Sequence, residues 1–402
     1  MSMSDAVPEH AQPDPGAPKR RGKARKRHTV GKVLLATTLV LVMATGLGTV
    51  WLYRHLNGNL SVLDPTAQLS NRPDKVKVEG PKEPLNILVM GSDSRDCAGC
   101  NIDNLTGGGQ RSDTTILFHL SADRERAYGV SIPRDSMVDR PDCEAEDGKT
   151  IPGADNVMWN EAFALGGPAC TIQQFEQLTG VRLDHFVVVN FEGFQGMVDA
   201  IGGVEVCIPE PIVDPAHGIN IAAGTRKIKG KEALNYVRER YVVGNGSDIG
   251  RMKRQQAFIG SMAHQVVTAG TLARPDHLVG FLNAATQSLT VDPGLENVWK
   301  IAKLGVEFKG IGLDNIQFIT IPNIPDPADP NRLVWQEPQA DQVWQKLARD
   351  EPLTKKLSEG VISAGNLPGS GSTSDSGSGS GSGSGSTSEA EKQALADAGL
   401  CT

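Results

Sequence analysis

The feature that most constrains the fold of this chain is an uncharged stretch near its N-terminus. The 21 residues from Val33 to Tyr53 include no charged side chain, and Lys32 and Arg54 bracket them. At about 1.5 Å per residue, a helix of this length spans roughly 30 Å, the thickness of one hydrocarbon core. We therefore expect residues 30–54 to form a transmembrane signal-anchor that places the two flanking parts in different compartments.

The flanking charges predict the orientation. Seven lysines and arginines crowd the segment from Lys19 to Arg27, and basic flanks stay in the cytoplasm. A cleaved signal peptide is the alternative, but its apolar region is usually about 7–15 residues, followed by a small-residue cleavage site that Leu56–Leu60 does not resemble. A DNA-binding arm is another interpretation of the basic run, but topology explains it more simply. We expect a single-pass cell-membrane protein with a cytoplasmic N-terminus, an extracellular globular part and no nucleic-acid partner.

Composition divides the chain into five parts. Residues 1–29 are Pro-rich and then basic, and are expected to be disordered. After the anchor, residues 55–84 are polar with scattered prolines, which is typical of a stalk. Residues 85–353 have a globular pattern. Residues 354–402 are expected to form a Gly/Ser-rich flexible linker and a C-terminal tail that fits a short helix and suggests no chemistry.

All cysteines follow the anchor, where disulfides can form and persist. They are Cys97, Cys100, Cys143, Cys170, Cys207 and Cys401. The first two form a Cys-x-x-Cys in a Gly-rich loop, which favours a loop-closing bridge over a redox motif. Cys143 with Cys170 is the favoured long-range pair. Metal binding by cysteines is unsupported, because no second Cys/His pair has suitable spacing.

Apolar runs alternate with helical patterns in the globular part. The expected strands are Leu85–Met90, Thr114–Leu120, Ala127–Ile132, His185–Phe191, Val204–Ile208 and Ile316–Ile321. The expected helices are Ile172–Leu178, Phe194–Ile201, Lys231–Val237, Ile249–Thr268, Pro275–Ser288 and Leu295–Phe308. This alternation predicts an α/β domain with a sheet between helical layers. The helices are rich in Leu, Val, Ala and Met, so a long apolar groove is compatible with them.

One short block concentrates positive charge. Within 17 residues the chain carries Arg238, Arg240, Arg251, Lys253 and Arg254. Guanidinium groups present planar donors suited to phosphate oxygens. Asp248 is the expected N-cap of the following helix, and Arg251, Arg254 and Gln255 share one helical face near its start. A solvated basic face is the alternative, but four converging arginines would repel each other without a bound phosphate or several carboxylates.

A second cluster is acidic. Asp93 and Asp113 lie near strand ends, in Gly91–Arg95 and Arg111–Thr114. Carboxylates with phosphate oxygens are ligands that Mg²⁺ prefers, although ordinary turn chemistry is the alternative. Arg134 follows another strand and could reach the same anion or pair with Asp135. Together the clusters predict a diphosphate site. Neither a zinc-hydrolase histidine spacing nor a Gly-x-Ser-x-Gly motif is present.

As a set, the motifs resemble the LytR–CpsA–Psr family over about residues 85–270. The matching segments are Asn86–Arg95, Arg111–Thr114, Val130–Asp135, Val189–Phe194, Val198–Val204 and the block from Tyr236 to Gln256. The resemblance implies a three-layer α/β/α sandwich with a central mixed sheet and a hydrophobic lipid-binding tunnel. It also implies phosphotransfer of a glycopolymer from a polyprenyl diphosphate carrier to peptidoglycan, assisted by Mg²⁺ or Mn²⁺, with a possible pyrophosphatase side activity.

Residue roles follow from the same resemblance. Asp93 and Asp113 would hold the metal or act as base, with Arg111 and Arg240 also catalytic; Asp248 would orient the arginines. Diphosphate contacts would come from Arg111, Arg134, Arg238, Arg240, Arg251 and Gln255. The chain departs from the family where Met158 replaces a frequent lysine, and an insertion from Asp96 to Gln110 could alter the mouth of the site. The alternatives are a non-catalytic polyprenyl-phosphate scaffold and a transcriptional attenuator.

Overall fold

A computed structural model describes residues 29–92, 112–268, 274–358, 360–369 and 389–402. Contacts between Cα atoms divide the chain into two units, Met1–Leu52 and Tyr53–Thr402. Helix α1 (Thr29–Asn59) contains the predicted anchor, residues 30–54. With a mean hydropathy of 2.1, it is long and apolar enough to cross a membrane. Its threonine hydroxyls, such as those of Thr38 and Thr49, donate to carbonyls one turn earlier, which satisfies them without water.

The second unit is built on an eight-stranded mixed sheet. The order is β1 (Ser61–Val62), β14 (Leu289–Val291), β9 (His185–Asn190), β2 (Leu85–Ser92), β3 (Ser112–Leu120), β4 (Ala127–Ile132), β15 (Ile316–Thr320) and β18 (Ile362–Ser363). Strands β9 and β15 run parallel to their neighbours β2 and β4, whereas β3 is antiparallel to both β2 and β4. The five longest strands coincide with predicted ones, because their apolar β-branched runs are strong signals.

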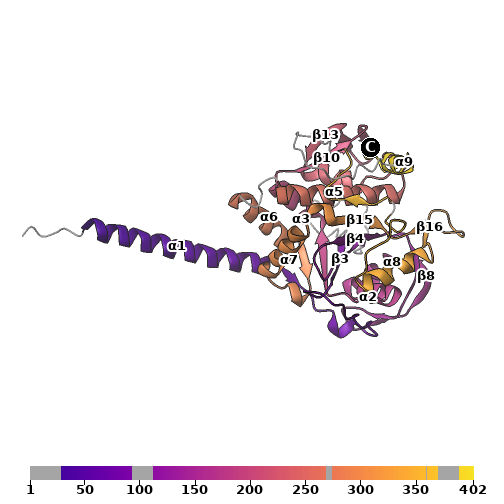
Figure 1. Cartoon of the computed structure of the whole chain (residues 1–402), viewed down its shortest axis with the longest axis horizontal. Helices are drawn as coiled ribbons and strands as arrows, with labels where there is room; N and C mark the ends of the chain where they lie inside the picture. Colours follow the sequence, from indigo (N-terminus) through magenta and orange to yellow (C-terminus); the bar gives the residue numbers. More distant parts are fainter. Residues whose placement is uncertain (1–28, 93–111, 269–273, 359, 370–388) are drawn as a thin grey trace, which may run out of the picture. The chain divides into compact units, whose positions relative to one another are not determined.

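Helices cover both faces of this sheet (Figure 1). On one face, Leu88 and Leu117 share a core with Phe175 of α2 (Glu161–Thr179) and Trp344 of α8 (Gln339–Ala348). On the other face, Phe318 and its neighbours pack with α5 (Asp248–Thr268) and α7 (Val298–Ile311). All six residues of β4 are buried, as expected for a strand covered on both sides. The predicted α/β/α sandwich is confirmed.

A second hydrophobic core lies beside α5 and includes its Phe258. Here α3 (Phe191–Ala200) and α4 (Gly230–Arg238) share a core with the antiparallel pair of β10 (Val204–Ile208) and β13 (Gly224–Ile228), which lies above α5 in Figure 1. The predicted strand Val204–Ile208 therefore exists, but outside the central sheet. The other α-helices of the described residues are α6 (Pro275–Ser288) and α9 (Glu389–Asp397). The other strands form four antiparallel pairs: β5 (Met137–Arg140) with β8 (Ala154–Met158), β6 (Cys143–Glu144) with β7 (Thr150–Ile151), β11 (Ile212–Asp214) with β12 (Ile219–Ile221) and β16 (Asn323–Pro325) with β17 (Leu333–Trp335).

Several boundaries differ from the predicted ones. Helix α2 begins at Glu161 and not at the predicted Ile172, because it continues across a kink at residues 166–168, whose Gly-Gly-Pro sequence does not look helical. Helix α7 starts at Val298, because the Asn297 side chain caps it by accepting from the Lys300 amide at 3.1 Å. The predicted stalk belongs to the folded unit, since β1 pairs with β14 and Arg72 forms an ion pair with buried Glu176. The fold also continues beyond residue 353, because β18 pairs with β15 and Ile362 is buried. The predicted domain end at residue 353 was too early, because the Gly/Ser-rich composition after residue 368 was extended to the residues before it.

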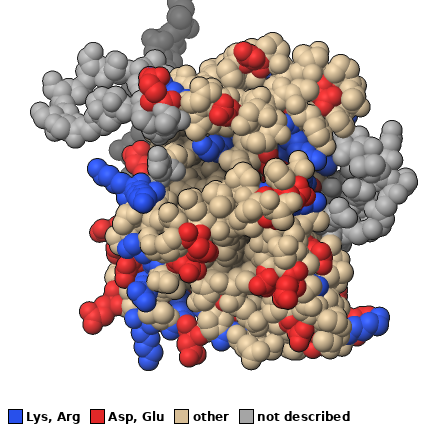
Figure 2. Space-filling model, turned by 90° about the vertical axis from the view of Figure 1, so that its right-hand side faces the viewer, with Lys and Arg blue, Asp and Glu red and all other residues tan. Residues whose placement is uncertain are grey.

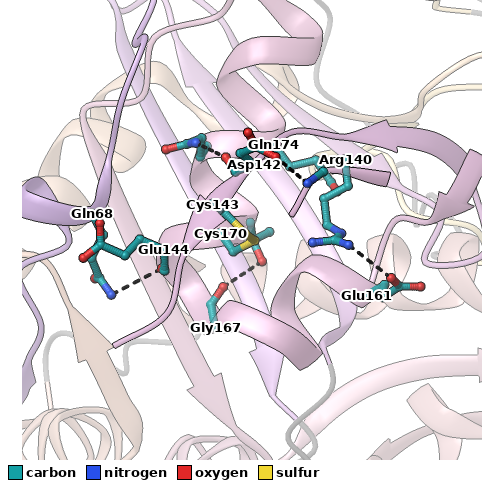
Figure 3. Close-up of a disulfide and its surroundings, with 12 residues drawn as sticks. Gln68, Arg140, Asp142, Cys143, Glu144, Glu161, Gly167, Cys170 and Gln174 are labelled. Carbon is teal, nitrogen blue, oxygen red and sulfur yellow. Dashed lines mark hydrogen bonds and ion pairs between the residues drawn. A yellow bond between two sulfur atoms is a disulfide. The ribbon is translucent and has the colours of Figure 1, made fainter. Parts of the chain in front are cut away.

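Two disulfides join the four cysteines that the structure describes. Cys143 and Cys170, the predicted pair, link β6 to α2 with their Cα atoms 5.3 Å apart. Figure 3 shows this bridge and, near it, Arg140 directed at Glu161. Nη2 of Arg140 lies 3.6 Å from Oε1 of Glu161. The second bridge, which was not predicted, joins Cys207 of β10 to Cys401 across 194 positions of sequence. Cys97 and Cys100 lie outside the described residues.

Candidate active site

Two strand ends and one helix start bring the predicted side chains together. Asp113 stands at the beginning of β3 and Arg134 directly after β4. These strands are antiparallel, with Thr115 opposite Ile132, so the two positions lie at the same edge of the sheet. Asp248 and Arg251 occupy the first turn of α5. Segments far apart in sequence therefore converge on one edge.

Asp248 is the centre of this convergence. Its Oδ1 atom lies 2.6 Å from Nη2 of Arg251, 3.6 Å from Nε of Arg134 and 3.9 Å from Nη1 of Arg240. The carboxylate is only 13% exposed, so these attractions are weakly screened. One partly buried aspartate thus faces three arginines, the arrangement in which a carboxylate orients guanidinium groups.

Asp113 is held by the same cluster. Its Oδ1 accepts from Nη1 of Arg134 at 2.8 Å, and Nε of Arg134 lies 3.5 Å from Asp135. Burial opposes ionisation, but Arg134, Arg251 and Arg238 outweigh it and hold the pKa of Asp113 below its ordinary value. Asp113 is therefore a carboxylate at any physiological pH and a weak base.

Positive charge exceeds negative charge among the described site residues. Four arginines (Arg134, Arg238, Arg240 and Arg251) stand against three aspartates (Asp113, Asp135 and Asp248). Burial lowers the pKa of Arg251, and neighbouring Arg134 and Arg240 add to this, although Asp248 opposes it. The buried Nε atoms of Arg134 and Arg251 find no hydrogen-bond acceptor within the described part of the chain. A bound anion would supply both charge and acceptors.

Aromatic rings hold the other two arginines. The Arg238 guanidinium lies over the ring of Phe191, 4.7 Å from its centroid. The Arg240 guanidinium lies 4.8 Å from the ring centroid of Tyr241 and donates to the Tyr241 hydroxyl at 2.8 Å. Cation–π contacts of this kind restrict a long side chain without neutralising its charge. The rings therefore limit the movement of both guanidinium groups.

Gln255 holds the backbone beside these arginines. Its amide nitrogen donates to the carbonyl of Val237 at 3.1 Å, and its amide oxygen accepts from Thr114 at 3.3 Å. Gln255 thus links the end of α4, where Arg238 begins the arginine block, to β3. Its predicted contact with diphosphate stays a prediction.

Arg254 departs from the predicted arrangement. The sequence predicts that it shares one helical face with Arg251 and Gln255, but it is 0% exposed and donates to the backbone carbonyls of Glu239 and Ala398. Burial lowers the pKa of Arg254 to about 10, an effect that Tyr236 and Glu239 partly offset. Burial likewise raises the pKa of Tyr236 to about 12. Nothing in the sequence around Arg254 indicates that the carbonyl of Ala398 accepts from it. Sequence reasoning therefore missed that Arg254 binds backbone carbonyls.

The remaining predicted residues are less constrained. Asp93 and Arg111 lie outside the described residues. Met158, the position of the missing lysine, ends β8 opposite Met137. Within the described ranges, no three His, Cys, Asp or Glu side chains converge as a metal site. Figure 2 shows that basic and acidic side chains are interspersed on one face of the molecule, unlike the broad basic surface that binds nucleic-acid backbones.

The fold and the cluster define an α/β/α protein with arginines gathered around one aspartate at one edge of its sheet. The sequence pattern of the LytR_cpsA_psr family matches residues 53–349, and the chain therefore belongs to the LytR–CpsA–Psr family.

Relatives and a solved structure agree with this assignment. The chain is 31% identical over 338 residues to "Probable cell wall biosynthesis protein LcpB" of Corynebacterium glutamicum, covering 82% of this chain and 74% of that protein. It is 27% identical over 274 residues to "Polyisoprenyl-teichoic acid--peptidoglycan teichoic acid transferase TagU" of Enterococcus faecalis, covering 68% and 83%. A LytR-Csp2A-Psr enzyme from Actinomyces oris shares the fold with a TM-score of 0.52 at 18% identity, over 72% of this chain and 96% of that one.

Proposed function

We propose that this protein is a membrane-anchored phosphotransferase that moves a glycopolymer from a polyprenyl diphosphate carrier to peptidoglycan. The observation that carries the proposal is the group of three arginines around Asp248, beside Asp113. The names of LcpB and TagU, which refer to cell wall biosynthesis and teichoic acid transfer, support the reaction class. The basic segment before α1 supports a cytoplasmic N-terminus and an extracellular catalytic domain.

The arginines would hold the diphosphate. Arg134, Arg240 and Arg251 supply charge-assisted donors, and the start of α5 adds backbone amides and the positive end of its dipole. Asp248 keeps the guanidinium groups apart and oriented until the phosphate oxygens arrive. Their positions are thus set before binding, which is how preorganised charge lowers the barrier to phosphoryl transfer.

Asp113 fits a divalent cation better than a base. It is ionised, 20% exposed and placed at a strand end, and hard cations such as Mg²⁺ or Mn²⁺ take a carboxylate together with phosphate oxygens. Asp113 and, from sequence, Asp93 would hold the ion, which when bound neutralises charge on the phosphates. Since its arginine neighbours make Asp113 a weak base, we assign the base role to Asp93.

The reaction is a displacement at phosphorus. A peptidoglycan hydroxyl oxygen bonds to the phosphorus that carries the glycan, while the bond from that phosphorus to the bridging oxygen breaks. Polyprenyl phosphate leaves with the electron pair, and the hydroxyl proton passes to the base carboxylate and then to solvent. Water in place of the hydroxyl would give the pyrophosphatase side reaction. Positioning and charge neutralisation suffice, so no covalent intermediate with the protein is required.

A partly open space beside the sheet would hold the lipid. Val89, Phe118 and Val187 lie in central strands on the α5–α7 face, yet each is only partly buried. The apolar side chains opposite them on α7, Leu304 and Phe308, are also partly buried. A solidly filled sandwich would bury central-strand side chains fully. This incomplete burial supports the proposed tunnel for a polyprenyl chain.

The decisive experiment compares two arginine variants of the full-length protein in detergent, supplied with a polyprenyl diphosphate glycan, peptidoglycan fragments and Mg²⁺. Arg240→Ala should lower polyprenyl phosphate release by roughly 100-fold, as expected when one preorganised charge is removed. Arg274→Ala, which removes an exposed arginine at the start of α6, is the matched control. Normal glycan transfer by Arg240→Ala would exclude this site. Substrate binding by the wild type without any release would instead indicate a scaffold.

A further inference from the structure

The last part of the chain packs against the back of the arginine block. We define residues 389–402, which comprise α9 and Ala398–Thr402, as the C-terminal strap. The Asn245 amide donates to the carbonyl of Asp397 at 2.9 Å, and Nη1 of Arg254 donates to the carbonyl of Ala398 at 2.8 Å. The strap thus contacts the loop between α4 and α5, which carries Arg240 and leads to Asp248.

Arg254 connects the strap to the arginines through backbone. Its second guanidinium nitrogen donates to the carbonyl of Glu239, the residue between Arg238 and Arg240. The Glu239 carboxylate in turn accepts from the Tyr241 amide at 2.6 Å. Because Arg254 is completely buried, losing either carbonyl would leave donors unsatisfied. The strap and the peptide that carries both arginines are therefore held by the same guanidinium.

Glycines allow the two backbones to touch. Gly244 has a φ of +59°, and a Cβ atom there would collide with the Asp397 carbonyl oxygen. A Cβ on Gly250, in the first turn of α5, would lie 3.1 Å from the same oxygen. On the other side, Gly399 has a φ of +66° and packs against Val243. Side chains at these positions would push the strap away, so the contact depends on their absence.

Two anchors keep the strap in place. Ala398 and Leu400 are 0% and 3% exposed and belong to the core formed by β15, β18 and α5. The disulfide from Cys401 to Cys207 fixes the next residue to β10. Apolar burial thus supplies affinity, and the covalent bond removes the freedom to dissociate.

From these contacts we propose that the C-terminal strap, locked by Cys207–Cys401, positions Arg238 and Arg240 for the diphosphate through Arg254. Arg254 is then a positioning residue that never touches the ligand. The strap replaces solvent as the acceptor for Arg254 and limits the movement of the loop between α4 and α5. The identity of the ligand rests on the proposed function, whereas the restraint on the loop does not.

The test uses full-length protein in detergent and two readouts. Hydrogen exchange of the Glu239–Ser247 amides reports the restraint, and calorimetry with inorganic pyrophosphate reports anion binding. Cys207→Ser with Cys401→Ser, and separately Arg254→Lys, should speed exchange and weaken pyrophosphate binding, each roughly tenfold, the factor expected when one hydrogen bond to a charged group is lost. The matched control is Cys143→Ser with Cys170→Ser, which removes the other disulfide.

The outcomes separate the two proposals. The control should melt at a lower temperature with exchange and pyrophosphate affinity at wild-type values. If the strap variants show the same pattern, the strap is only a stabilising element and the inference is overturned. If one strap variant does not fold, the other decides. Should the wild type fail to bind pyrophosphate, the diphosphate site is wrong, while exchange still tests the restraint.

Discussion

At the scale of single residues, the main property of the site is that its arginines outnumber the carboxylates that face them. Arg251 is 5% exposed and has Arg134 and Arg240 as neighbours, and Asp248 offsets only part of the cost of burying its charge. The cluster is thus a poor stabilising element by itself, because buried charges cost desolvation energy that one aspartate only partly offsets. An anion bound beside these arginines would therefore stabilise the folded protein.

Asp248→Asn tests this balance. The substitution leaves Arg251 buried beside like charges and should lower the free energy of unfolding by about 3 kcal/mol, as when one partner of a buried pair is removed. Pyrophosphate should then stabilise the variant more, relative to its own ligand-free state, than it stabilises the wild type. Chemical denaturation with and without pyrophosphate measures both quantities. Equal stability of variant and wild type would show that Asp248 does not balance the cluster.

The low pKa of Asp113 gives a second test at this scale. Its folded pKa lies below the ordinary value of 3.8, so its ionisation contributes stability that is present above that pH and lost as pH falls through the folded pKa. Arg134→Gln removes the main cationic partner, and acid unfolding should then begin at higher pH. Arg332→Gln is the control, because it removes a different ion pair, in which Nη1 of Arg332 lies 3.3 Å from Oδ1 of Asp135. Identical shifts for both variants would contradict the assigned cause.

Sequence reasoning reached most of this site and misplaced one member. Arginines and aspartates beside strand ends and a helix start carry strong signals, so Asp113, Arg134, Arg240, Asp248 and Arg251 were named and do converge. Helical spacing predicts one face for Arg254 and Arg251. Spacing alone cannot show that the C-terminal strap covers Arg254. Its acceptor comes from Ala398, 144 positions away.

At the scale of elements, long apolar runs predicted the central strands and main helices, and weak patterns failed. Strands β1, β14 and β18 have two or three residues each and exist only through pairing with longer strands. Helix-to-helix approach was also invisible in sequence. In α3, Gly193 lies against Ser288 of α6, so closely that an added Cβ would collide with the serine side chain.

Gly193→Ala should therefore destabilise the protein by about 1–3 kcal/mol, the cost of overpacking a tight contact. Ser288→Gly in the same chain should recover part of the loss, because it removes the colliding group. Gly305→Ala in α7 is the control: nothing lies within 4 Å of its added Cβ, and higher helix propensity should stabilise it by about 0.5–1 kcal/mol. Thermal and chemical unfolding of the wild type and the three variants measure these differences. An unaffected Gly193→Ala protein would mean that α3 and α6 are farther apart than described.

At the scale of the whole molecule, disulfides and topology make one argument. Two bridges join distant segments of the folded unit, and such bonds persist in oxidising compartments. The basic residues 19–27 precede α1, and basic flanks stay cytoplasmic. Both observations favour the proposed orientation, in which the domain that follows α1 lies outside the cell. Neither depends on the site residues, so orientation can be tested independently of activity.

Reporter fusions supply that test in living cells. A phosphatase that needs disulfides to fold should be active when fused after Thr402 and inactive when fused after His28. Exchanging the seven basic residues between positions 19 and 27 for glutamine should reduce activity of the Thr402 fusion, because the charge asymmetry that sets orientation is lost. A fluorescent protein that matures only in the cytoplasm should give the opposite pattern at both sites. An active phosphatase at His28 would contradict the proposed orientation, because the arginine cluster would then lie on the other side of the membrane from peptidoglycan.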